Sequence, residues 1–370
     1  YQDFFHFSKI SINLFISFIL WNSFSKYFLA LSPNSFFCSS LNFINLMIKV
    51  LRNITLILVT LLVLIIFSGT YLDLPREELE RKYATGASNF LNLSDGTRIH
   101  YRDEGQSNLP VIVFLHGMNG SLFNFERLVP FLKNDFRIIS LDFPGFGLTG
   151  SIPSADYSTN SFIETINQIT DHLEASSFSL AGNSMGGGVA WRYALRYPEK
   201  VDTLILLSSS GVYSKKYRET RQQETRESPW VWKLMRSDIV SSFLSFYTPK
   251  FFATQGLRAS VYNEKLATHK LAYQFHDLTL LSGSRRAILS MFSRRSGDYN
   301  SPEVLRSIKA PVLVIHGKED NLIPFESSSV FEENIQDVEL KIYDKVGHLP
   351  MYEVPLKVSD DIKEFHRRKF

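Results

Sequence analysis

The sequence predicts an α/β fold: a doubly wound, mostly parallel sheet with a helical insertion after the sixth strand. The first observation is that short apolar runs alternate with amphipathic helical runs over most of residues 89–370. The second is that this alternation stops between residues 211 and 300, which read as helical, aromatic and basic. The composition, with 44% hydrophobic residues and a net charge of +3, provides for a large core and does not indicate a nucleic-acid binder.

The apolar residues of the sequence predict where the strands and helices lie. Val111–Leu115 is entirely apolar, as expected of a strand that is buried on both faces of a parallel sheet. The other predicted strands are 90–93, 98–101, Arg137–Leu141, 178–181, Val201–Leu207, 311–316 and Val338–Tyr343. Helical spacing of apolar residues predicts helices at 125–132, 161–173, 185–197, 326–334 and 356–367, and Pro130 interrupts the first of these.

An apolar segment precedes the α/β part. Residues 53–72 carry one charge-free stretch after Lys49 and Arg52, and twenty helical residues cover about 30 Å, the thickness of a bilayer core. Because no small-residue cleavage site follows, we expect an uncleaved membrane anchor at 47–72, with a cleaved signal peptide as the alternative. The two basic residues favour the cytoplasmic side, which would place the C-terminal part on the extracytoplasmic side.

The first 46 residues differ from the rest. They contain no methionine and only three charged residues, and the first methionine of the chain is Met47. We expect residues 1–46 to be translated upstream sequence without function. The alternative is that they are genuine and add one or two further spans, such as 10–25. Residues 73–88 would form a short charged connector from the anchor to the α/β part.

The segment Gly182-Asn-Ser-Met-Gly186 matches the G-x-S-x-G pattern of a nucleophile elbow. In an elbow, a serine stands on a sharp turn between a strand and a helix, and small residues are needed on both sides. The predicted strand and helix flank the pattern in the required order, which makes Ser184 the candidate nucleophile. For the pentapeptide alone, a glycine-rich turn with an incidental serine is the alternative.

Two further residues complete a catalytic triad in the order serine, acid, histidine. Asp320 follows the predicted strand at 311–316, and His348 follows the strand Val338–Tyr343. Glu319 is the rival acid, but the position of Asp320 relative to the strand end favours Asp320. His348 would accept the proton of the serine, and Asp320 would fix the histidine tautomer.

The negatively charged oxygen of a tetrahedral intermediate needs two N–H donors. We expect the first from the backbone of Met185, which directly follows the nucleophile. The second should come from the loop at 116–121, where Met118 is favoured and Asn119 is next. This loop and the elbow would form the oxyanion hole together.

Two other titratable residues lie in predicted turns. His116 is expected to brace its loop rather than to catalyse. Asp142, in the segment Asp142-Phe-Pro-Gly-Phe-Gly147, could pass for an acid, but its proline and glycine neighbours indicate a structural turn. The triad supplies each proton transfer that the reaction needs, so no metal or organic cofactor is implied. The single cysteine, Cys38, excludes an intrachain disulfide.

Together these motifs resemble the α/β-hydrolase family over roughly residues 89–370. The sequence Gly-Asn-Ser-Met-Gly-Gly occurs in bacterial lipases and esterases and in carbon–carbon bond hydrolases, and the latter commonly carry Trp after the catalytic histidine. Leu349 holds that position here, so the chain looks more like the lipase and esterase branch, including membrane-anchored monoacylglycerol lipases. Family members that use Asp as nucleophile are set apart by Ser184.

The resemblance implies a carboxylic ester hydrolase that works through an acyl-enzyme on a small-molecule or lipid-like substrate. A carbon–carbon bond hydrolase and an acyltransferase with the same triad stay open within enzymes. A non-catalytic binding module is a different class, and the complete triad argues against it.

The resemblance also divides the α/β part into a core at 89–210 and 301–370 and a cap at 211–300. Aromatic cap residues are expected to line an acyl pocket, and the candidates for substrate binding are Trp230, Trp232, Phe243 and Phe246. The cap carries fifteen Lys and Arg against seven Asp and Glu. The hypothesis is that this basic cap faces an anionic leaflet, and the alternative is a solvated basic surface.

These interpretations predict how two shortened chains behave. A chain that starts at Met47 should keep both its activity and its membrane association, because residues 1–46 contribute to neither. A chain that starts at about Asp73 should be a soluble, active hydrolase. N-terminal sequencing of the protein made from the native gene checks the first expectation directly, and a peptide from residues 1–46 in that material would contradict it.

Overall fold

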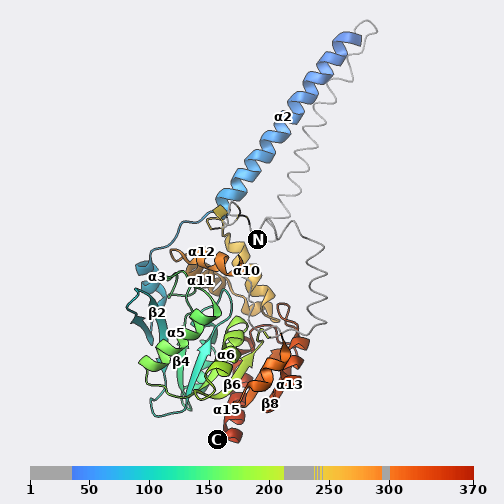
Figure 1. Cartoon of the computed structure of the whole chain (residues 1–370). Helices are drawn as coiled ribbons and strands as arrows, with labels where there is room; N and C mark the ends of the chain where they lie inside the picture. The colour runs from blue at the N-terminus through green and yellow to red at the C-terminus, as the bar shows by residue number, and fades with distance from the viewer. Residues whose placement is uncertain (1–35, 212–236, 238–239, 241, 244, 294–300) are drawn as a thin grey trace. The chain divides into compact units, whose positions relative to one another are not determined.

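The computed structural model describes residues 36–211, 237, 240, 242–243, 245–293 and 301–370, and it divides into two compact units, Tyr1–Phe67 and Ser68–Phe370. In the first unit the chain enters a long helix, α2 (Phe36–Gly69), drawn in blue in Figure 1. Its segment Phe43–Gly69 is 27 residues long and apolar enough to cross a membrane. The helix begins before the predicted anchor at 47–72 and ends at Gly69, three residues before the predicted end of the anchor.

The second unit is built on an eight-stranded sheet with the order β1-β2-β4-β3-β5-β6-β7-β8. The first three strands of this order pair antiparallel, and all other neighbours pair parallel. The strands are β1 Ser88–Asn92, β2 Arg98–Glu104, β3 Val111–Leu115, β4 Arg137–Leu141, β5 Phe178–Asn183, β6 Val201–Leu207, β7 Val312–Gly317 and β8 Val338–Tyr343. The predicted doubly wound, mostly parallel sheet is confirmed.

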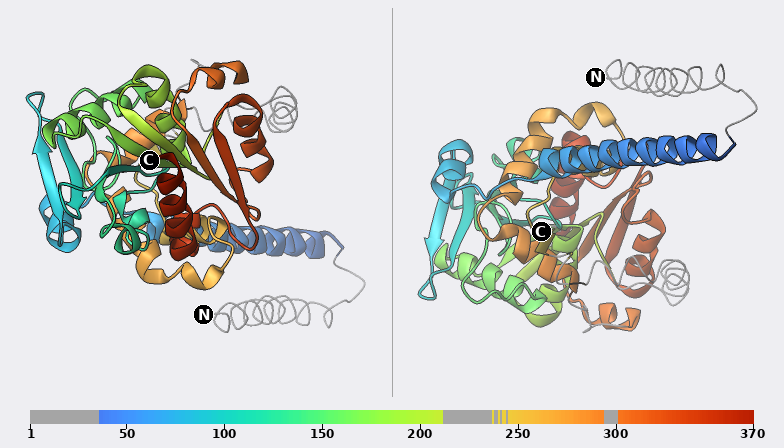
Figure 2. Two further views of the ribbon diagram at one scale, coloured as in Figure 1. Left: turned by 90° about the horizontal axis from the view of Figure 1, so that it is seen from below. Right: turned by 90° about the horizontal axis from the view of Figure 1, so that it is seen from above.

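Helices cover both faces of the sheet (Figures 1 and 2). Successive side chains of a strand point to opposite faces, so a strand of apolar residues has two apolar faces, and each must be covered. On β7, Val312 and Val314 pack into the core beneath α5 and α6, whereas Leu313 and Ile315 pack into the core beneath α4 and α15. The helices of these layers are α4 Val129–Leu132, α5 Thr159–His172, α6 Met185–Arg196, α13 Ser329–Asn334, α14 Pro350–Glu353 and α15 Pro355–Lys369.

Two predicted helices are each divided in the structure. The prediction at 125–132 becomes a 3-10 turn, η1 (Leu122–Phe125), and the short helix α4. Pro130 lies at the start of α4, where its missing N–H is tolerated, so it begins a helix rather than interrupting one. The prediction at 326–334 likewise becomes η4 (Phe325–Ser328) followed by α13.

The helical insertion after β6 is confirmed. Its described part contains α10 (Lys250–Ala259), η2 (Glu264–Leu266), α11 (His269–Thr279) and α12 (Ser284–Ser293). The chain between β6 and α10 is described only in part. The predicted pocket residues Trp230 and Trp232 therefore lie outside the described residues.

The chain that follows α2 is docked onto the cap. Thr70 forms a β-bridge with Tyr247, and the N–H of Tyr71 donates to the carbonyl of Phe246. The predicted connector at 73–88 holds the helix α3 (Arg76–Tyr83), whose Leu79 is buried among cap and core residues. A shortened chain that starts at Asp73 loses the pairing with Tyr247, so Ser68 is the better place to start one.

Candidate active site

The predicted nucleophile stands on a strained turn between β5 and α6. Ser184 has φ 54° and ψ −119°, a left-handed conformation that is unfavourable for a residue with a side chain. Its N–H donates to the carbonyl of Leu207 at 3.1 Å, and its carbonyl accepts from the N–H groups of Gly188 and Ser210, both at 3.0 Å. These bonds on both sides of the residue hold the strained conformation.

Two glycines allow the backbones around the turn to touch. A Cβ on Gly182 would lie 2.4 Å from the carbonyl of Gly186, and a Cβ on Gly186 would lie 2.3 Å from the carbonyl oxygen of Leu115. Any side chain at either position would push α6 away from β5 or β3. The packing of α6 against β5 and β3 therefore requires glycine at both ends of the G-x-S-x-G motif.

The predicted acid and base are in direct contact. The ring Nδ1 of His348 lies 2.7 Å from Oδ2 of Asp320, and both residues are buried, with 5% and 8% of their surface exposed. The carboxylate accepts at this distance, so Nδ1 carries the proton and Nε2 is left as the basic nitrogen. The order of elements thus brings together two residues that lie 28 positions apart.

Burial by itself would raise the pKa of the Asp320 carboxyl group. Hydrogen bonds from His316 and His348, and from the backbone N–H of Ile323, outweigh burial and hold that pKa well below its usual value. Asp320 is therefore a carboxylate at neutral pH and can only accept hydrogen bonds.

The histidine loop is joined to the residue before the nucleophile. The side-chain Nδ2 of Asn183 donates to the carbonyls of Leu207, at 3.0 Å, and His348, at 3.1 Å. The described residues show no hydrogen bond between the side chains of Ser184 and His348, and such bonds are often long before substrate binds. The structure thus brings the three predicted triad residues to one edge of the sheet.

The rival acid has another partner. The carboxylate of Glu319 accepts the N–H of Val346 at 3.0 Å, and the N–H of Glu319 donates back to the carbonyl of Val346 at the same distance. This pair of bonds fixes the loop before His348 but does not reach its ring. The geometry favours Asp320 as the acid.

The predicted oxyanion loop lies against the nucleophile. A Cβ on Gly117 would lie 3.0 Å from the Cβ of Ser184. A turn follows in which the N–H of Gly120 donates to the carbonyl of Gly117, and Asn119 has φ 60°. The two candidate donor residues therefore adjoin Ser184 on different sides, Met185 along the chain and Met118 through Gly117.

His116 holds this loop from within. Its Nδ1 lies 2.7 Å from the carbonyl of Gly117, and its Nε2 accepts the N–H of Phe143 at 3.0 Å, so the ring is the neutral Nδ1–H tautomer. Burial lowers the pKa of His116 below its usual value. With both nitrogens occupied, the ring braces the loop, as expected from the sequence.

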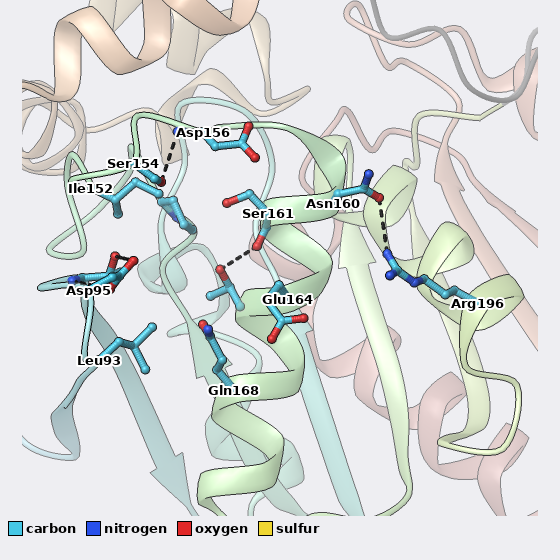
Figure 3. Close-up of a pocket in the computed structure, with 13 residues that line it drawn as sticks. Leu93, Asp95, Ile152, Ser154, Asp156, Asn160, Ser161, Glu164, Gln168 and Arg196 are labelled. Carbon is cyan, nitrogen blue, oxygen red and sulfur yellow. Dashed lines mark hydrogen bonds between the residues drawn. The ribbon is translucent and has the colours of Figure 1, made fainter.

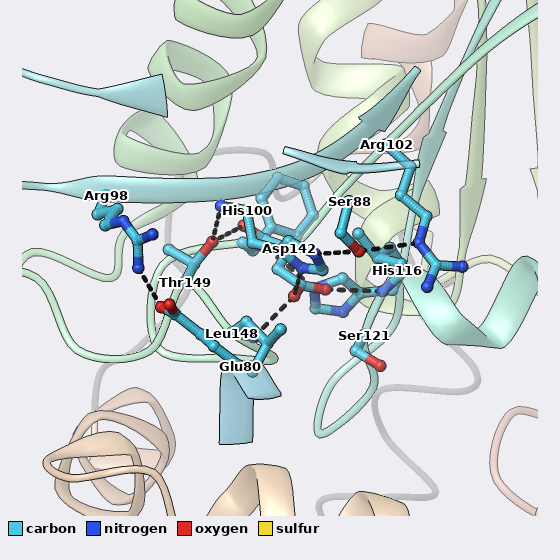
Figure 4. Close-up of polar contacts among 12 residues, drawn as sticks. Glu80, Ser88, Arg98, His100, Arg102, His116, Ser121, Asp142, Leu148 and Thr149 are labelled. Carbon is cyan, nitrogen blue, oxygen red and sulfur yellow. Dashed lines mark hydrogen bonds and ion pairs between the residues drawn. The ribbon is translucent and has the colours of Figure 1, made fainter. Parts of the chain in front are cut away.

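Asp142 is the centre of a separate, closed network (Figure 4). Its Oδ2 lies 2.6 Å from Nδ1 of His100 and accepts the N–H of Leu148, and its Oδ1 accepts the N–H of Leu122 at 2.7 Å. A Cβ on Gly147 would lie 2.0 Å from Oδ2, so the turn closes over the carboxylate. All three of these donors belong to the surrounding structure, which agrees with the predicted structural turn.

Two polar residues of the site were missed from the sequence. His316, the penultimate residue of β7, lies with Nε2 3.1 Å from Oδ2 of Asp320 and 2.9 Å from the carbonyl of Ile323. Glu353, in α14, accepts the N–H of Gly347 at 2.7 Å and that of Tyr262 at 2.8 Å. A histidine within an otherwise apolar strand, four residues before the candidate acid, was the available signal for His316.

Glu353 connects the cap to the histidine loop. Its second oxygen also accepts from Asn263, and the N–H of His348 donates to the carbonyl of Ser260 at 2.9 Å. Burial raises the pKa of Glu353 above its usual value although three backbone N–H groups bind the carboxylate. The end of α10 and the loop that carries His348 are thus tied together by backbone groups.

The two described candidates for substrate binding are half exposed on the cap. Phe243 and Phe246 expose 46% and 48% of their surface, and Phe243 stacks on Tyr247 with ring centroids 5.2 Å apart. Their described contacts are with the cap and with the chain after α2, so a role in lining an acyl pocket stays a prediction.

A cavity of about 430 Å³ lies elsewhere, between the β1–β2 turn and α5 (Figure 3). None of the candidate catalytic residues lines it. Its lining is mostly polar and includes four charged residues, Asp95, Asp156, Glu164 and Arg196, and Arg196 donates to Asn160, which also lines it. The candidate site at Ser184 is therefore recognised by the types and contacts of its residues and not by this cavity.

A comparison with known families agrees with this geometry. The model of the alpha/beta hydrolase fold family matches residues 110–355, two thirds of the chain. The chain belongs to the alpha/beta hydrolase fold family. The resemblance inferred from the motifs is confirmed for family and fold, and the protein is a hydrolase.

Relatives within the hydrolases have different activities. The chain is 24% identical to Lipase 1 of Psychrobacter immobilis, over 74% of the chain and 82% of the relative. It is 25% identical to 2-hydroxymuconate semialdehyde hydrolase of a Pseudomonas species, over 74% and 92%. The crystal structure of a membrane phospholipase A has a TM-score of 0.62 at 22% identity and covers 89% of this chain and 98% of its own.

The Asp142 network predicts a large loss of stability in Asp142→Asn. The amide nitrogen would face a backbone N–H or the imidazole in place of an acceptor, which costs roughly 2–4 kcal/mol in a buried site. Denaturant unfolding at neutral pH checks this, and Asp344→Asn, which removes an exposed carboxylate, should stay within about 0.5 kcal/mol of wild type.

The same network predicts a pH dependence. Burial opposes ionisation of Asp142, but His100 and the backbone donors outweigh it, so the pKa is lower in the folded chain. The carboxylate's contribution is present above the ordinary carboxyl pKa and is lost as the pH falls through the folded value. The difference in the free energy of unfolding between wild type and Asp142→Asn should therefore become smaller in acid. A difference that grows as the pH falls would contradict this interpretation.

Proposed function

We propose that this hydrolase cleaves carboxylic esters through an acyl-enzyme formed on Ser184. His348, through Nε2, takes the serine proton as Oγ attacks the ester carbonyl, and then returns that proton to the departing alcohol. Asp320 holds the Nδ1–H tautomer and stabilises the imidazolium. In the second half, His348 activates a water that releases the acid. The contact of 2.7 Å between His348 and Asp320 beside the strained elbow carries this proposal.

The oxyanion of each tetrahedral intermediate would be bound by backbone N–H groups. Met185 heads α6, so its N–H belongs to the unsatisfied first turn of a helix, where negative charge is stabilised. Met118 follows Gly117, whose backbone lies against Ser184. This arrangement supports Met185 and Met118 as the two donors.

The same residues suit the alternative, a carbon–carbon bond hydrolase. Relatives of both kinds match the chain with similar identity and coverage. Two observations favour the ester hydrolase: Leu349 is buried after the histidine, where the carbon–carbon hydrolases commonly carry Trp, and an apolar helix of membrane-spanning length precedes the domain. An acyltransferase would use the same acyl-enzyme with an alcohol in place of water.

The helix α2 supports a location at a membrane, with the hydrolase domain on the extracytoplasmic side as the basic residues before the span favour. Directly after α2, Thr70 and Tyr71 pair with the cap residues Tyr247 and Phe246. Exposed aromatic side chains stand on the neighbouring helix α10, where Phe251 exposes 63% of its surface. This arrangement supports entry of acyl substrates from lipid beneath a basic, aromatic cap.

The triad predicts the ranking of three variants. Ser184→Ala should lower turnover by about a millionfold, and Asp320→Asn by about ten-thousandfold through the wrong histidine tautomer. Glu319→Gln is the matched control and should stay within about tenfold of wild type, since Glu319 contacts only backbone. Hydrolysis rates of the purified full chain check the order. A larger loss in Glu319→Gln than in Asp320→Asn would reverse the choice of acid.

A substrate panel separates the two chemistries. The wild-type chain is assayed with p-nitrophenyl esters from acetate to palmitate and, in parallel, with 2-hydroxymuconate semialdehyde. We expect ester hydrolysis to dominate, with longer chains preferred if substrates enter from lipid. Faster carbon–carbon cleavage than hydrolysis of any ester would establish the alternative.

A further inference from the structure

We propose that His316 is a positioning residue for the triad, which donates a second hydrogen bond to the Asp320 oxygen that His348 binds. Through this bond His316 sets how strongly the carboxylate attracts the His348 ring and in which orientation it holds that ring. The proposal rests on the proposed function, because it needs Ser184, His348 and Asp320 to act as one unit.

The partners of His316 fix its tautomer. Its Nε2 lies 3.1 Å from Oδ2 of Asp320 and 2.9 Å from the carbonyl oxygen of Ile323. Both atoms are acceptors, so Nε2 must carry a proton. Its Nδ1 is buried and has no hydrogen-bond partner among the described residues. A second proton there would be buried without an acceptor among these residues, so the geometry favours donation through Nε2 alone.

The Asp320 carboxylate is then completely occupied. Its Oδ1 accepts the N–H groups of Leu322, at 2.8 Å, and Ile323, at 2.9 Å. Its Oδ2 accepts from both His348 and His316. A carboxylate offers about four lone-pair positions, so four donors fill it. The carboxylate cannot rotate without breaking several of these bonds, which fixes the direction in which Oδ2 meets the His348 ring.

The second donor also moderates the charge on Oδ2. A hydrogen bond from a neutral N–H draws electron density from the oxygen and weakens its attraction for a positively charged neighbour. Without His316, Oδ2 of Asp320 would accept a hydrogen bond from His348 alone and would stabilise the His348 imidazolium more strongly. The free base would then form only at a higher pH, and Ser184 would lose its proton acceptor in mildly acidic solution.

The other titratable groups around this cluster are directed elsewhere. Glu319, on the same loop, binds the N–H of Val346, and Glu353, in α14, binds backbone N–H groups of the histidine loop and of the cap. Lys318 is exposed and pairs with Asp344. Among the described residues, the two histidines are the side chains that bond to Asp320, so replacing His316 changes one contact of the carboxylate.

The test measures how fast a fluorophosphonate labels Ser184 as a function of pH, using the full chain in detergent. This rate needs the free base of His348 but no particular substrate. His316→Phe, which removes the donor at similar size, should move the acidic half-point upward by about half a pH unit to one unit. It should also lower the plateau rate by about tenfold, while the KM for an ester stays unchanged.

His316→Gln is the matched control. Glutamine keeps a neutral N–H donor at a similar reach but cannot take up a proton, so its half-point should return close to that of wild type. An unshifted half-point in His316→Phe, or a half-point in His316→Gln equal to that of His316→Phe, would overturn the proposal. Should His316→Phe not fold, His316→Asn, whose amide is too short to reach Oδ2, must show the same shift.

The outcomes distinguish this proposal from the proposed function. A chain that is labelled at Ser184 but cleaves no ester disproves the ester hydrolase, and its labelling profile still tests His316. A wild-type chain that is not labelled at all overturns both. A shifted half-point in His316→Phe, reversed in His316→Gln, supports the positioning role whichever bond the enzyme cleaves.

Discussion

The whole site depends on how closely the backbones of β3, β5 and α6 approach one another. Gly182 and Gly186 are in contact, and Gly186 also touches the end of β3. This contact lets the chain turn from strand to helix within one residue, which forces Ser184 into its left-handed conformation. It also brings Gly117 against the serine. A larger residue at either glycine would separate Ser184 from the loop beside it.

Three carboxylates near this edge of the sheet, the buried Asp142 and Asp320 and the partly buried Glu353, have different hydrogen-bond donors, and the donors determine the role of each. Asp142 is enclosed by a turn and by backbone N–H groups, and its histidine partner, His100, is fully buried and has its other ring nitrogen bonded to Ser88. Glu353 binds backbone groups alone and acts as a clamp. Asp320 meets two imidazoles, those of His316 and His348. Residue type and burial alone would not distinguish the role of Asp142 from that of Asp320.

The strands were predicted to within a few residues because buried parallel strands consist of almost uninterrupted apolar residues, as in Val111–Leu115. The candidate triad was predicted because its order along the chain follows from the order of the strands. His316 was missed, since its bond to Asp320 depends on the shape of the loop at 317–323. The contacts of Phe246 were missed because they come from Tyr71, which is distant in sequence.

The histidine loop is held to the cap through main-chain groups of the cap. The N–H groups of Tyr262 and Asn263 donate to the Glu353 carboxylate, and the carbonyl of Ser260 accepts the N–H of His348. Such groups exist whatever side chains the cap carries. Side-chain substitutions in this part of the cap should therefore leave its link to the loop of His348 intact. An insertion or deletion at the end of α10, by contrast, would displace these backbone groups and break the link.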